Sequence, residues 1–451
     1  VDGGTIKLDG NYPTGTENLA LGDTALDSLT TGYHNVAIGS GSMTANTTGY
    51  DNTAIGRTSL TANTTGGLNT ALGRFALGSN ITGNSNTAVG RSALGSNNTN
   101  NNTAVGYQAL FNNTTGTELT ALGIEALTSN TTANQNTAIG RRASYRNTTG
   151  SGNVAVGRNA SYENLTGGNN TAIGLSALQN NTADNNTAVG YQTMLNNSTG
   201  TNNVAMGYQT LRQNTTASNN TAIGNLALHN NTTASFNTAV GFQSLYSNVS
   251  GTRNVAVGYN ALSLSTANDN TAIGHDALDV TTTGANNTAV GSNSLGSNTS
   301  GFSNVALGYQ ALYSNTTAGN NTALGVESMK NTTTGSNNVA VGNDTLKTNL
   351  TGASNVAIGG LSLNSNTVSD NTAVGYRAST SNSTGTLNTV VGKDAGYDGT
   401  TGSYNTFIGY NSGGQITTGS KNTIIGRYQG NQDGLDIRTS SNNIVLSDGD
   451  G

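Results

Sequence analysis

Residues 102–110 read Asn-Thr-Ala-Val-Gly-Tyr-Gln-Ala-Leu, and close variants of this stretch recur along the 451-residue chain. The core of the motif, Asn-Thr/Val-Ala-aliphatic-Gly, ends at 25 glycines from Gly22 to Gly426. Twenty of the steps between these glycines are 17 residues long and four are 16. Repetition at one short period is the signature of a stacked architecture, so the period decides the fold class.

Each position of the unit is counted here from the motif glycine, which is position 0. Position −4 is Asn in 24 of the 25 units, with Leu119 as the exception, and position −1 is Val, Ile, Leu or Met in all of them. A small residue at +3 and usually Leu or Met at +4 form a second apolar patch, as in Ala109-Leu110. A polar stretch such as residues 147–150, Asn-Thr-Thr-Gly, closes the unit, and the four short units lack its Thr-Gly turn. One edge of the unit is therefore a turn that tolerates a deletion.

A 17-residue period is too short for a two-helix repeat, and Thr, Asn, Gly and β-branched residues are poor helix formers. The period predicts an all-β, parallel β-solenoid of about 25 coils of 16–17 residues, each with two short strands and two turns. Coils that stack at ~4.8 Å place equal residues over one another. The recurring Asn is therefore expected to hydrogen-bond its counterparts in the adjacent coils or to cap a turn.

The pattern changes at both ends of the array. We expect residues 18–430 to form the solenoid, residues 1–17 to hold a lead-in strand at 5–8, and residues 431–451 to form a transition segment. In the last three coils, about 388–430, position −2 changes from Ala to a large residue and position +4 changes to Gly, which indicates volume-conserving repacking. The larger residues are Val390, Phe407 and Ile424, and the glycines are Gly396, Gly413 and Gly430. Residues 443–447 form a decayed copy of the motif.

The composition excludes several classes of function. Only 33% of the chain is apolar and 9% is charged, with a net charge of −5, three His and no Cys. These values argue against a basic nucleic-acid surface, a disulfide framework, a cysteine nucleophile and a His-rich metal site. No apolar run approaches the length of a membrane span. We therefore expect no cofactor, no metal, no nucleic acid and no membrane insertion, and the opening Val1-Asp2 suggests a segment of a longer polypeptide.

Neighbouring apolar residues predict an assembly. Ala104-Val105 and Ala109-Leu110 are adjacent pairs, and adjacent residues of a strand point to opposite faces. A thin coil has one interior, so the second apolar face is expected to be covered by another copy of the chain. The alternative is a monomeric solenoid with one apolar flank in solvent.

The motif at 102–110, with its relatives at 203–211 and 304–312, resembles the head repeats of trimeric autotransporter adhesins (YadA-like heads). It is more similar still to the Asn-Thr-Ala-Val-Gly arrays of tailed-phage tail fibres. The resemblance covers residues 18–451 and implies a left-handed β-roll wound as an elongated homotrimer. In the fibre family a segment like residues 441–451 often precedes a C-terminal intramolecular chaperone, whose chemistry is assigned to no residue here.

Position +1 is the candidate contact strip. The residues concerned are Arg57, Arg74, Arg91, Arg141 and Arg158, and Tyr107, Tyr191, Tyr208, Tyr259, Tyr309, Tyr376 and Tyr410. If this position faces outward, the arginines form a ladder of like charges that favours an acidic surface polysaccharide, and the tyrosines could stack on sugar rings. The alternative is that these long side chains only shield the flank of the solenoid.

We expect no catalytic residue. The nearest carboxylate pairs, Glu118 with Glu125 and Asp276 with Asp279, do not recur and are interpreted as solvated acids. The favoured function is a trimeric shaft or receptor-binding region of a virion tail fibre. Its partners would be itself, a host-surface polysaccharide or outer-membrane receptor, and other tail proteins. The alternatives are a bacterial surface adhesin, located outside the cell, and an ice-binding solenoid built on Thr pairs such as Thr47-Thr48.

Overall fold

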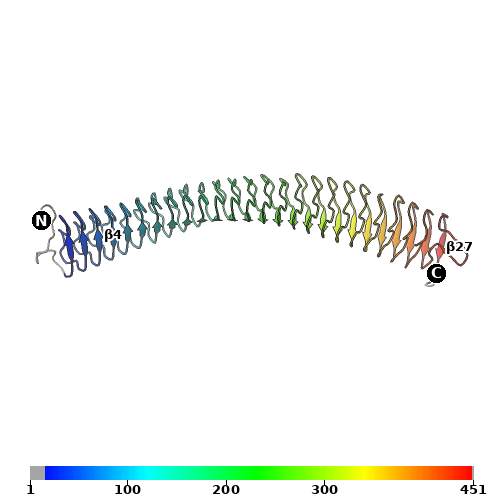
Figure 1. Cartoon of the computed structure of the whole chain (residues 1–451), viewed down its shortest axis with the longest axis horizontal. Coiled ribbons are helices and arrows are strands. Elements are labelled where there is room, and N and C mark those ends of the chain that lie inside the picture. The colour runs from blue at the N-terminus through cyan, green and yellow to red at the C-terminus, as the bar shows by residue number, and fades with distance from the viewer. Residues whose placement is uncertain (1–15, 449–451) are drawn as a thin grey trace. The chain divides into compact units, whose positions relative to one another are not determined.

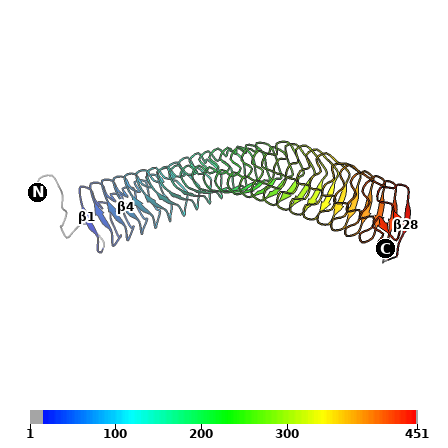
Figure 2. The same ribbon diagram turned by 45° about the vertical axis from the view of Figure 1, so that its right-hand side comes forward.

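The computed structural model of the chain describes residues 16–448, which contain no helix and 28 strands. The chain divides into two compact units, Val1–Ile223 and Gly224–Gly451, and each unit is a stack of coils. In each unit the strands lie side by side along one face, and the rest of each coil returns on the other side as turns (Figures 1 and 2). The predicted all-β solenoid of about 25 coils is confirmed.

The strands of the first unit are β1 (Leu19–Leu21), β2 (Val36–Ile38), β3 (Thr53–Ile55), β4 (Thr70–Leu72), β5 (Thr87–Val89), β6 (Thr103–Val105), β7 (Thr120–Leu122), β8 (Thr137–Ile139), β9 (Val154–Val156), β10 (Thr171–Ile173), β11 (Thr187–Val189), β12 (Val204–Met206) and β13 (Thr221–Ile223). Each pairs in parallel with the next, in the register of the repeat; Ala54, for example, lies opposite Ala71. Alanine at −2 is fully buried throughout the unit except for Ala20, which is 4% exposed.

The strands of the second unit are β14 (Thr238–Val240), β15 (Val255–Val257), β16 (Thr271–Ile273), β17 (Thr288–Val290), β18 (Val305–Leu307), β19 (Thr322–Leu324), β20 (Val339–Val341), β21 (Val356–Ile358), β22 (Thr372–Val374), β23 (Thr389–Val391), β24 (Thr406–Ile408), β25 (Thr423–Ile425), β26 (Asn431–Gln432), β27 (Leu435–Asp436) and β28 (Ile444–Leu446). Strands β14–β25 form a parallel ladder of the same kind, with Ala256 opposite Ala272 for example.

The second apolar patch is not a strand, contrary to the sequence prediction of two strands per coil. Gln108 at +2 and Leu110 at +4 have φ of 52°, in the left-handed region, while Ala109 between them does not. Because φ changes sign from residue to residue, neighbours in this run do not alternate between two faces. Ala109 and Leu110 both point inward and are fully buried. The inference that adjacent apolar residues point to opposite faces therefore holds for the strand, such as Ala104-Val105, but not for the second patch, such as Ala109-Leu110.

A buried ladder of Asn side chains at −4 joins one coil to the next, as predicted. The Asn69 Nδ2 donates to the carbonyl oxygen of Gly83 (2.8 Å), and its Oδ1 accepts from the backbone N–H and Nδ2 of Asn86 (3.0 and 3.1 Å). These bonds satisfy backbone groups that no strand reaches. At Leu119 the ladder is interrupted, because leucine offers no acceptor to the following coil.

A second buried Asn ladder runs along position +7, which the sequence analysis assigned only to a turn. The Asn63 Nδ2 donates to Asn46 Oδ1 (2.8 Å) and to the carbonyl oxygen of Gly66 (2.9 Å), three residues further on. One amide thus closes its own turn and also holds the neighbouring coil. Asn occupies +7 in 18 of the 25 units, and this recurrence was the available signal.

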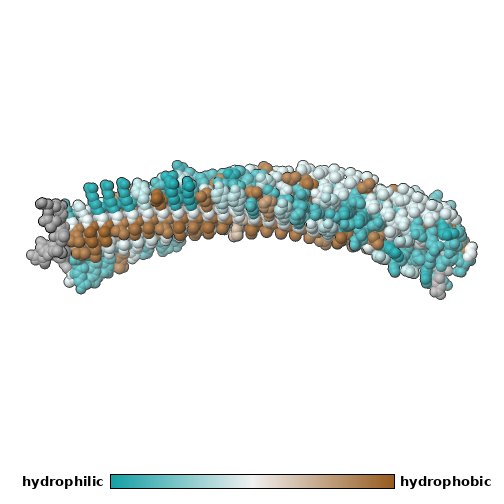
Figure 3. All heavy atoms as spheres, viewed as in Figure 1, coloured by the Kyte–Doolittle hydropathy of each residue, from teal (hydrophilic) through white to brown (hydrophobic). Residues whose placement is uncertain are grey.

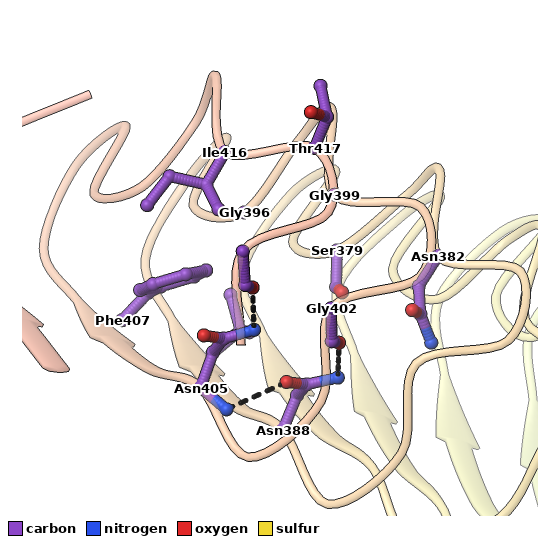
Figure 4. Close-up of a pocket in the computed structure, with 12 residues that line it drawn as sticks. Ser379, Asn382, Asn388, Gly396, Gly399, Gly402, Asn405, Phe407, Ile416 and Thr417 are labelled. Carbon is purple, nitrogen blue, oxygen red and sulfur yellow. Dashed lines mark hydrogen bonds between the residues drawn. The ribbon is translucent and has the colours of Figure 1, made fainter. Parts of the chain in front are cut away.

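The interior is repacked in the last coils, as Figure 4 shows. Phe407 is 3% exposed, and its ring lies over Gly396 and Gly413. A Cβ on Gly413 would lie 2.8 Å from the Phe407 ring, so the ring occupies the space that leucine fills in other coils. The remaining void, of about 10 Å³, is at the lower limit for one water.

The predicted transition segment after residue 430 contains three short strands. Strands β26 and β27 form a short antiparallel hairpin, after which β28 pairs with β25 in the register of the repeat, Val445 opposite Ile424. The Asn443 N–H and Nδ2 donate to Asn422 Oδ1 (3.0 and 2.8 Å), so the decayed copy continues the Asn ladder. The lead-in strand expected at residues 5–8 lies outside the described residues.

Candidate interaction surface

The outward face of the strands carries an aliphatic strip made of the position −1 residues. Its members are half exposed, for example Leu72 at 44% and Leu307 at 47%. In the first unit they are Leu21, Ile38, Ile55, Leu72, Val89, Val105, Leu122, Ile139, Val156, Ile173, Val189, Met206 and Ile223, and Figure 3 shows a brown row along this unit. Soluble monomers rarely expose contiguous apolar patches above a few hundred Å². The strip thus places one partly exposed apolar side chain on each strand of the parallel ladder.

The aliphatic strip of the second unit follows the same rule, with Val240, Val257, Ile273, Val290, Leu307, Leu324, Val341, Ile358, Val374, Val391, Ile408, Ile425 and Leu446. Its last strand is the most exposed, because Ile444 at −3 and Leu446 at −1 are 80% and 75% accessible. In most strands −3 is Thr, so β28 presents two aliphatic side chains outward where most strands present one.

The position +1 residues form a second exposed row, the flank column, beside the aliphatic strip. All five predicted arginines, Arg57, Arg74, Arg91, Arg141 and Arg158, are exposed, and so are the seven predicted tyrosines. The outward orientation on which the contact-strip hypothesis depended is thus observed. Within residues 16–448, none of these five guanidinium groups makes an ion pair.

Three arginines of the flank column lie in successive coils that contain few acids, and the nearest, Asp51, faces His34 (3.0 Å). Between Asn52 and Thr117 the sequence contains Arg57, Arg74 and Arg91 but no Asp or Glu. By contrast, Arg142 binds Glu125 (2.6 Å), and this carboxylate raises the pKa of the guanidinium. The three-arginine ladder, Arg57, Arg74 and Arg91, is therefore a run of three unpaired guanidinium groups in successive coils, and Arg141 and Arg158 form a shorter unpaired run in the same unit.

Two runs of aromatic residues in the flank column stack on one another instead of presenting their faces. Tyr191 and Tyr208 lie with ring centroids 5.2 Å apart and an interplanar angle of 11°. Phe242, Tyr259 and His275 continue the same geometry over three coils, at 5.2 and 4.9 Å. Their rings present edges to the outside, and in this arrangement a sugar cannot lie flat on the inner faces.

The remaining predicted tyrosines have cations near their rings, with one exception. The guanidinium of Arg91 lies 5.7 Å from the Tyr107 centroid, and that of Arg377 lies 5.3 Å from Tyr376. The Tyr410 ring has Lys393 at 5.8 Å and Arg427 at 5.6 Å. Tyr309 is 48% exposed and makes no ring contact of these kinds. Sugar stacking along the whole tyrosine row is therefore not favoured by the geometry.

Acids at position +2 generally have basic partners. Glu327 binds Lys330 (2.9 Å) and Lys347 (2.6 Å), and these hydrogen bonds lower its pKa to about 2. Asp344 also binds Lys347 (2.8 Å), and Asp394 binds Arg377 (2.7 Å). These pairs link position +2 with +5 or with the next coil, and they stabilise the flank modestly at most because such pairs are screened by solvent.

Asp276 and Asp279 break this rule, since position +5 carries a second acid instead of a lysine. Burial, and then the neighbouring Asp276 charge, raise the pKa of Asp279 to about 6. Asp276 Oδ2 lies 2.9 Å from His275 Nδ1, and Asp276 Oδ1 is buried without a hydrogen bond. The other predicted pair is not brought together as a reactive couple: Glu118 accepts from Gln135 (3.0 Å), and Glu125 is held by Arg142.

The surface also has a hollow in addition to the aliphatic strip and the flank column. An open cleft of about 320 Å³ at the end of the second unit is lined by Tyr428, Gln432, Leu435 and neighbours. Between residues 16 and 448, no group of three or more His, Asp or Glu side chains is placed to hold a metal. Nor does that part of the chain contain a helix with the length and apolarity to cross a bilayer.

The Thr pairs at the turn divide their roles. The Thr47 hydroxyl donates to the carbonyl oxygen of Thr64 (3.0 Å), one coil further on, and Thr148 does the same toward Leu165 (2.8 Å). The second Thr of each pair, such as Thr48 or Thr65, is exposed. The turn thus presents a single file of outward threonines, while the other hydroxyls hold the stack together.

No protein-family model matches the chain, and no curated protein sequence does either. The similarity to fibre and adhesin repeats therefore rests on the motif at 102–110 and its copies.

Proposed function

We propose that this chain is the shaft and adhesive region of a fibre in which three copies associate through their aliphatic strips. The carrying observation is the strip itself, an apolar side chain on every strand of the parallel ladder in both solenoid units. A row of apolar side chains that repeats once per coil packs best against another row with the same spacing. Another copy of the same chain has that period, and three copies follow the resemblance to trimeric β-rolls.

A tail fibre of a phage particle, attaching the virion to its host, is the setting that the motif supports best. In this role a stack of identical coils presents many equivalent weak contacts, and multivalency replaces a deep pocket. The structure offers outward rows of side chains for such contacts. No residue is assigned a catalytic role.

A bacterial surface adhesin of the trimeric autotransporter kind is the second candidate, because the same motif occurs in those heads. An ice-binding solenoid has weaker support: the first hydroxyl of each Thr pair is used between coils, as in Thr47 and Thr148. We expect no thermal hysteresis from the purified protein.

The assembly is tested by measuring molar mass with light scattering coupled to size exclusion. We expect about three times the 45.4 kDa of one chain. A particle at the mass of one chain would contradict the fibre, and a particle at twice that mass would keep self-association through the strip but replace the trimer with a dimer. Binding of the labelled protein to candidate host cells then tests adhesion separately from assembly.

A further inference from the structure

The three-arginine ladder of the first unit has the features of a ligand site. Arg57, Arg74 and Arg91 occupy equivalent positions in three coils joined by the pairing of β3, β4 and β5. All three are exposed, and none is compensated by an acid between residues 52 and 117. At other positions of the coil arginines are paired, since Arg146, Arg253 and Arg377 each bind a carboxylate at 2.6–2.8 Å. The other two flank-column arginines, Arg141 and Arg158, are unpaired but form a run of only two.

Stacking makes this arrangement unfavourable on its own. Like charges separated by the ~4.8 Å between coils repel by about 1 kcal/mol even at the dielectric constant of water. Two such neighbours flank the central Arg74. An anion placed between adjacent guanidinium groups would remove this repulsion and accept their forked N–H donors.

We propose that Arg57, Arg74 and Arg91, ending at Tyr107, bind a linear anionic polysaccharide laid along the direction of coil stacking. The proposal rests on the proposed adhesive function and names the ligand class for one part of the surface. One sugar of an extended glycan has about the length of one coil step. A glycan with one carboxylate or sulfate per sugar therefore offers an anion to each successive arginine.

The same observations argue against a nucleic acid as the ligand. Single-stranded nucleic acids are bound through free aromatic faces on which bases stack, together with a long basic groove. Here the Tyr107 ring has the Arg91 guanidinium near its face (5.7 Å), and the ladder contains only three cations in a chain of net charge −5. An anionic sugar chain can be bound by the paired N–H donors of the guanidinium groups without aromatic stacking.

The test uses the full chain and titrates it, by calorimetry, with a short oligogalacturonate, a neutral maltodextrin of similar length and an oligothymidylate of equal charge. We expect the oligogalacturonate to bind and to weaken in high salt, because exposed charge pairs are screened. The double variant Arg74→Gln/Arg91→Gln should lose about tenfold in affinity. The variant Arg74→Lys/Arg91→Lys keeps the charges and should retain part of the binding.

The matched control is Arg146→Gln/Arg253→Gln, which removes the same charge from two arginines that are exposed but already paired. This variant should bind the oligogalacturonate as the wild type does. Equal losses in both double variants, unchanged binding in the ladder variant, equal binding of maltodextrin, or tighter binding of oligothymidylate would each overturn the proposal. A wild-type chain that forms trimers and adheres to cells but does not bind oligogalacturonate would overturn the ladder site alone and leave the fibre standing.

Discussion

At the scale of single residues, the coil depends on side chains that complete the backbone hydrogen bonds of their neighbours. Asparagine is suited to this role because one amide can both donate and accept, as Asn69 of the −4 ladder and Asn63 of the +7 ladder do. Their positions are buried, so a missing partner cannot be replaced by solvent. Individual asparagines of the two ladders should therefore contribute more to the stability of the fold than polar residues at exposed positions do.

Replacing Asn69 by alanine should lower the free energy of unfolding by about 2–4 kcal/mol, because three buried hydrogen bonds are lost and their partners are left unsatisfied. Urea denaturation followed by circular dichroism measures this change. Asn343→Ala, at an exposed position of the flank column, is the control and should have little effect. Equal effects of the two variants would mean that the ladder contributes no special stability.

Asp279 should make the second unit less stable as the pH rises. Its pKa is about 6 in the folded chain and about 3.8 when unfolded, so the folded state holds the proton more tightly between these values. The destabilisation is absent below the unfolded value and complete above about pH 6. The substitution Asp279→Asn should therefore raise the melting temperature at pH 7.5 and have little effect at pH 3.5.

Asp276→Asn provides the second measurement for the same pair. Removing the neighbouring charge should shift the pH dependence of stability toward lower pH, while the part of the pKa shift caused by burial remains. If Asp279→Asn gave the same gain at both pH values, side-chain packing rather than charge would be the cause.

At the scale of the coil, one three-residue strand and a long run of turns replace the two strands expected from the sequence. The strand at −3 to −1 was predictable because it carries β-branched residues, mostly Thr or Val at −3 and often Val or Ile at −1. The backbone conformation of positions +2 to +4 was not predictable. Residues such as Gln108 and Leu110 do not favour the left-handed conformation, which costs them about 1–2 kcal/mol each. The regular stack supplies the burial and hydrogen bonds that hold it.

The contents of the candidate surface were predictable to a similar extent. The period alone placed every position +1 residue in one row, and exposure of that row is observed. The stacking of Tyr191 on Tyr208 depends on side-chain rotamers, which no repeat pattern specifies. The absence of carboxylates around Arg74 was readable in the sequence, but its meaning required the structure to show that other arginines are paired.

The exchange between positions −2 and +4 in the last coils can be tested by a double-mutant cycle. Phe407→Ala should cost about 3–5 kcal/mol by opening a cavity. Gly413→Leu alone should also destabilise, because a side chain there meets the Phe407 ring. The double variant restores the pattern of the other coils and should recover a large part of the loss.

Thermal unfolding of the four proteins in the cycle gives the coupling between the two sites. Strictly additive losses would contradict the interpretation that the phenyl ring replaces leucine. Gly396 also lies close to the same ring, so complete recovery is not expected from one leucine.

At the scale of the whole molecule, the aliphatic strip separates the stability of the coil from the stability of the assembly. Its side chains point away from the interior, which is filled by Ala at −2 and mostly by Leu at +4. Changes in the strip should therefore affect association while leaving each chain folded. The interior and the outer face can be mutated independently.

The variant Ile55→Lys/Leu72→Lys should convert the assembled particle into single chains, because two buried charges without partners would oppose association. Light scattering measures the mass, and circular dichroism checks that the β signal is retained. The control Thr48→Lys/Thr65→Lys adds the same charges to exposed threonines of the turn and should keep the mass of the wild type. Dissociation of both variants would point to general charge repulsion instead of the strip.

The regular register of the strands has an evolutionary consequence. Ala54 lies opposite Ala71, and the same pairing recurs from coil to coil, so a coil inserted between two others meets neighbours that it already fits. Gene segments encoding such units are prone to unequal recombination, and each event would add or remove whole coils without creating a new interior. Length can thus drift between lineages faster than the cross-section, and alleles of different coil number should remain able to fold.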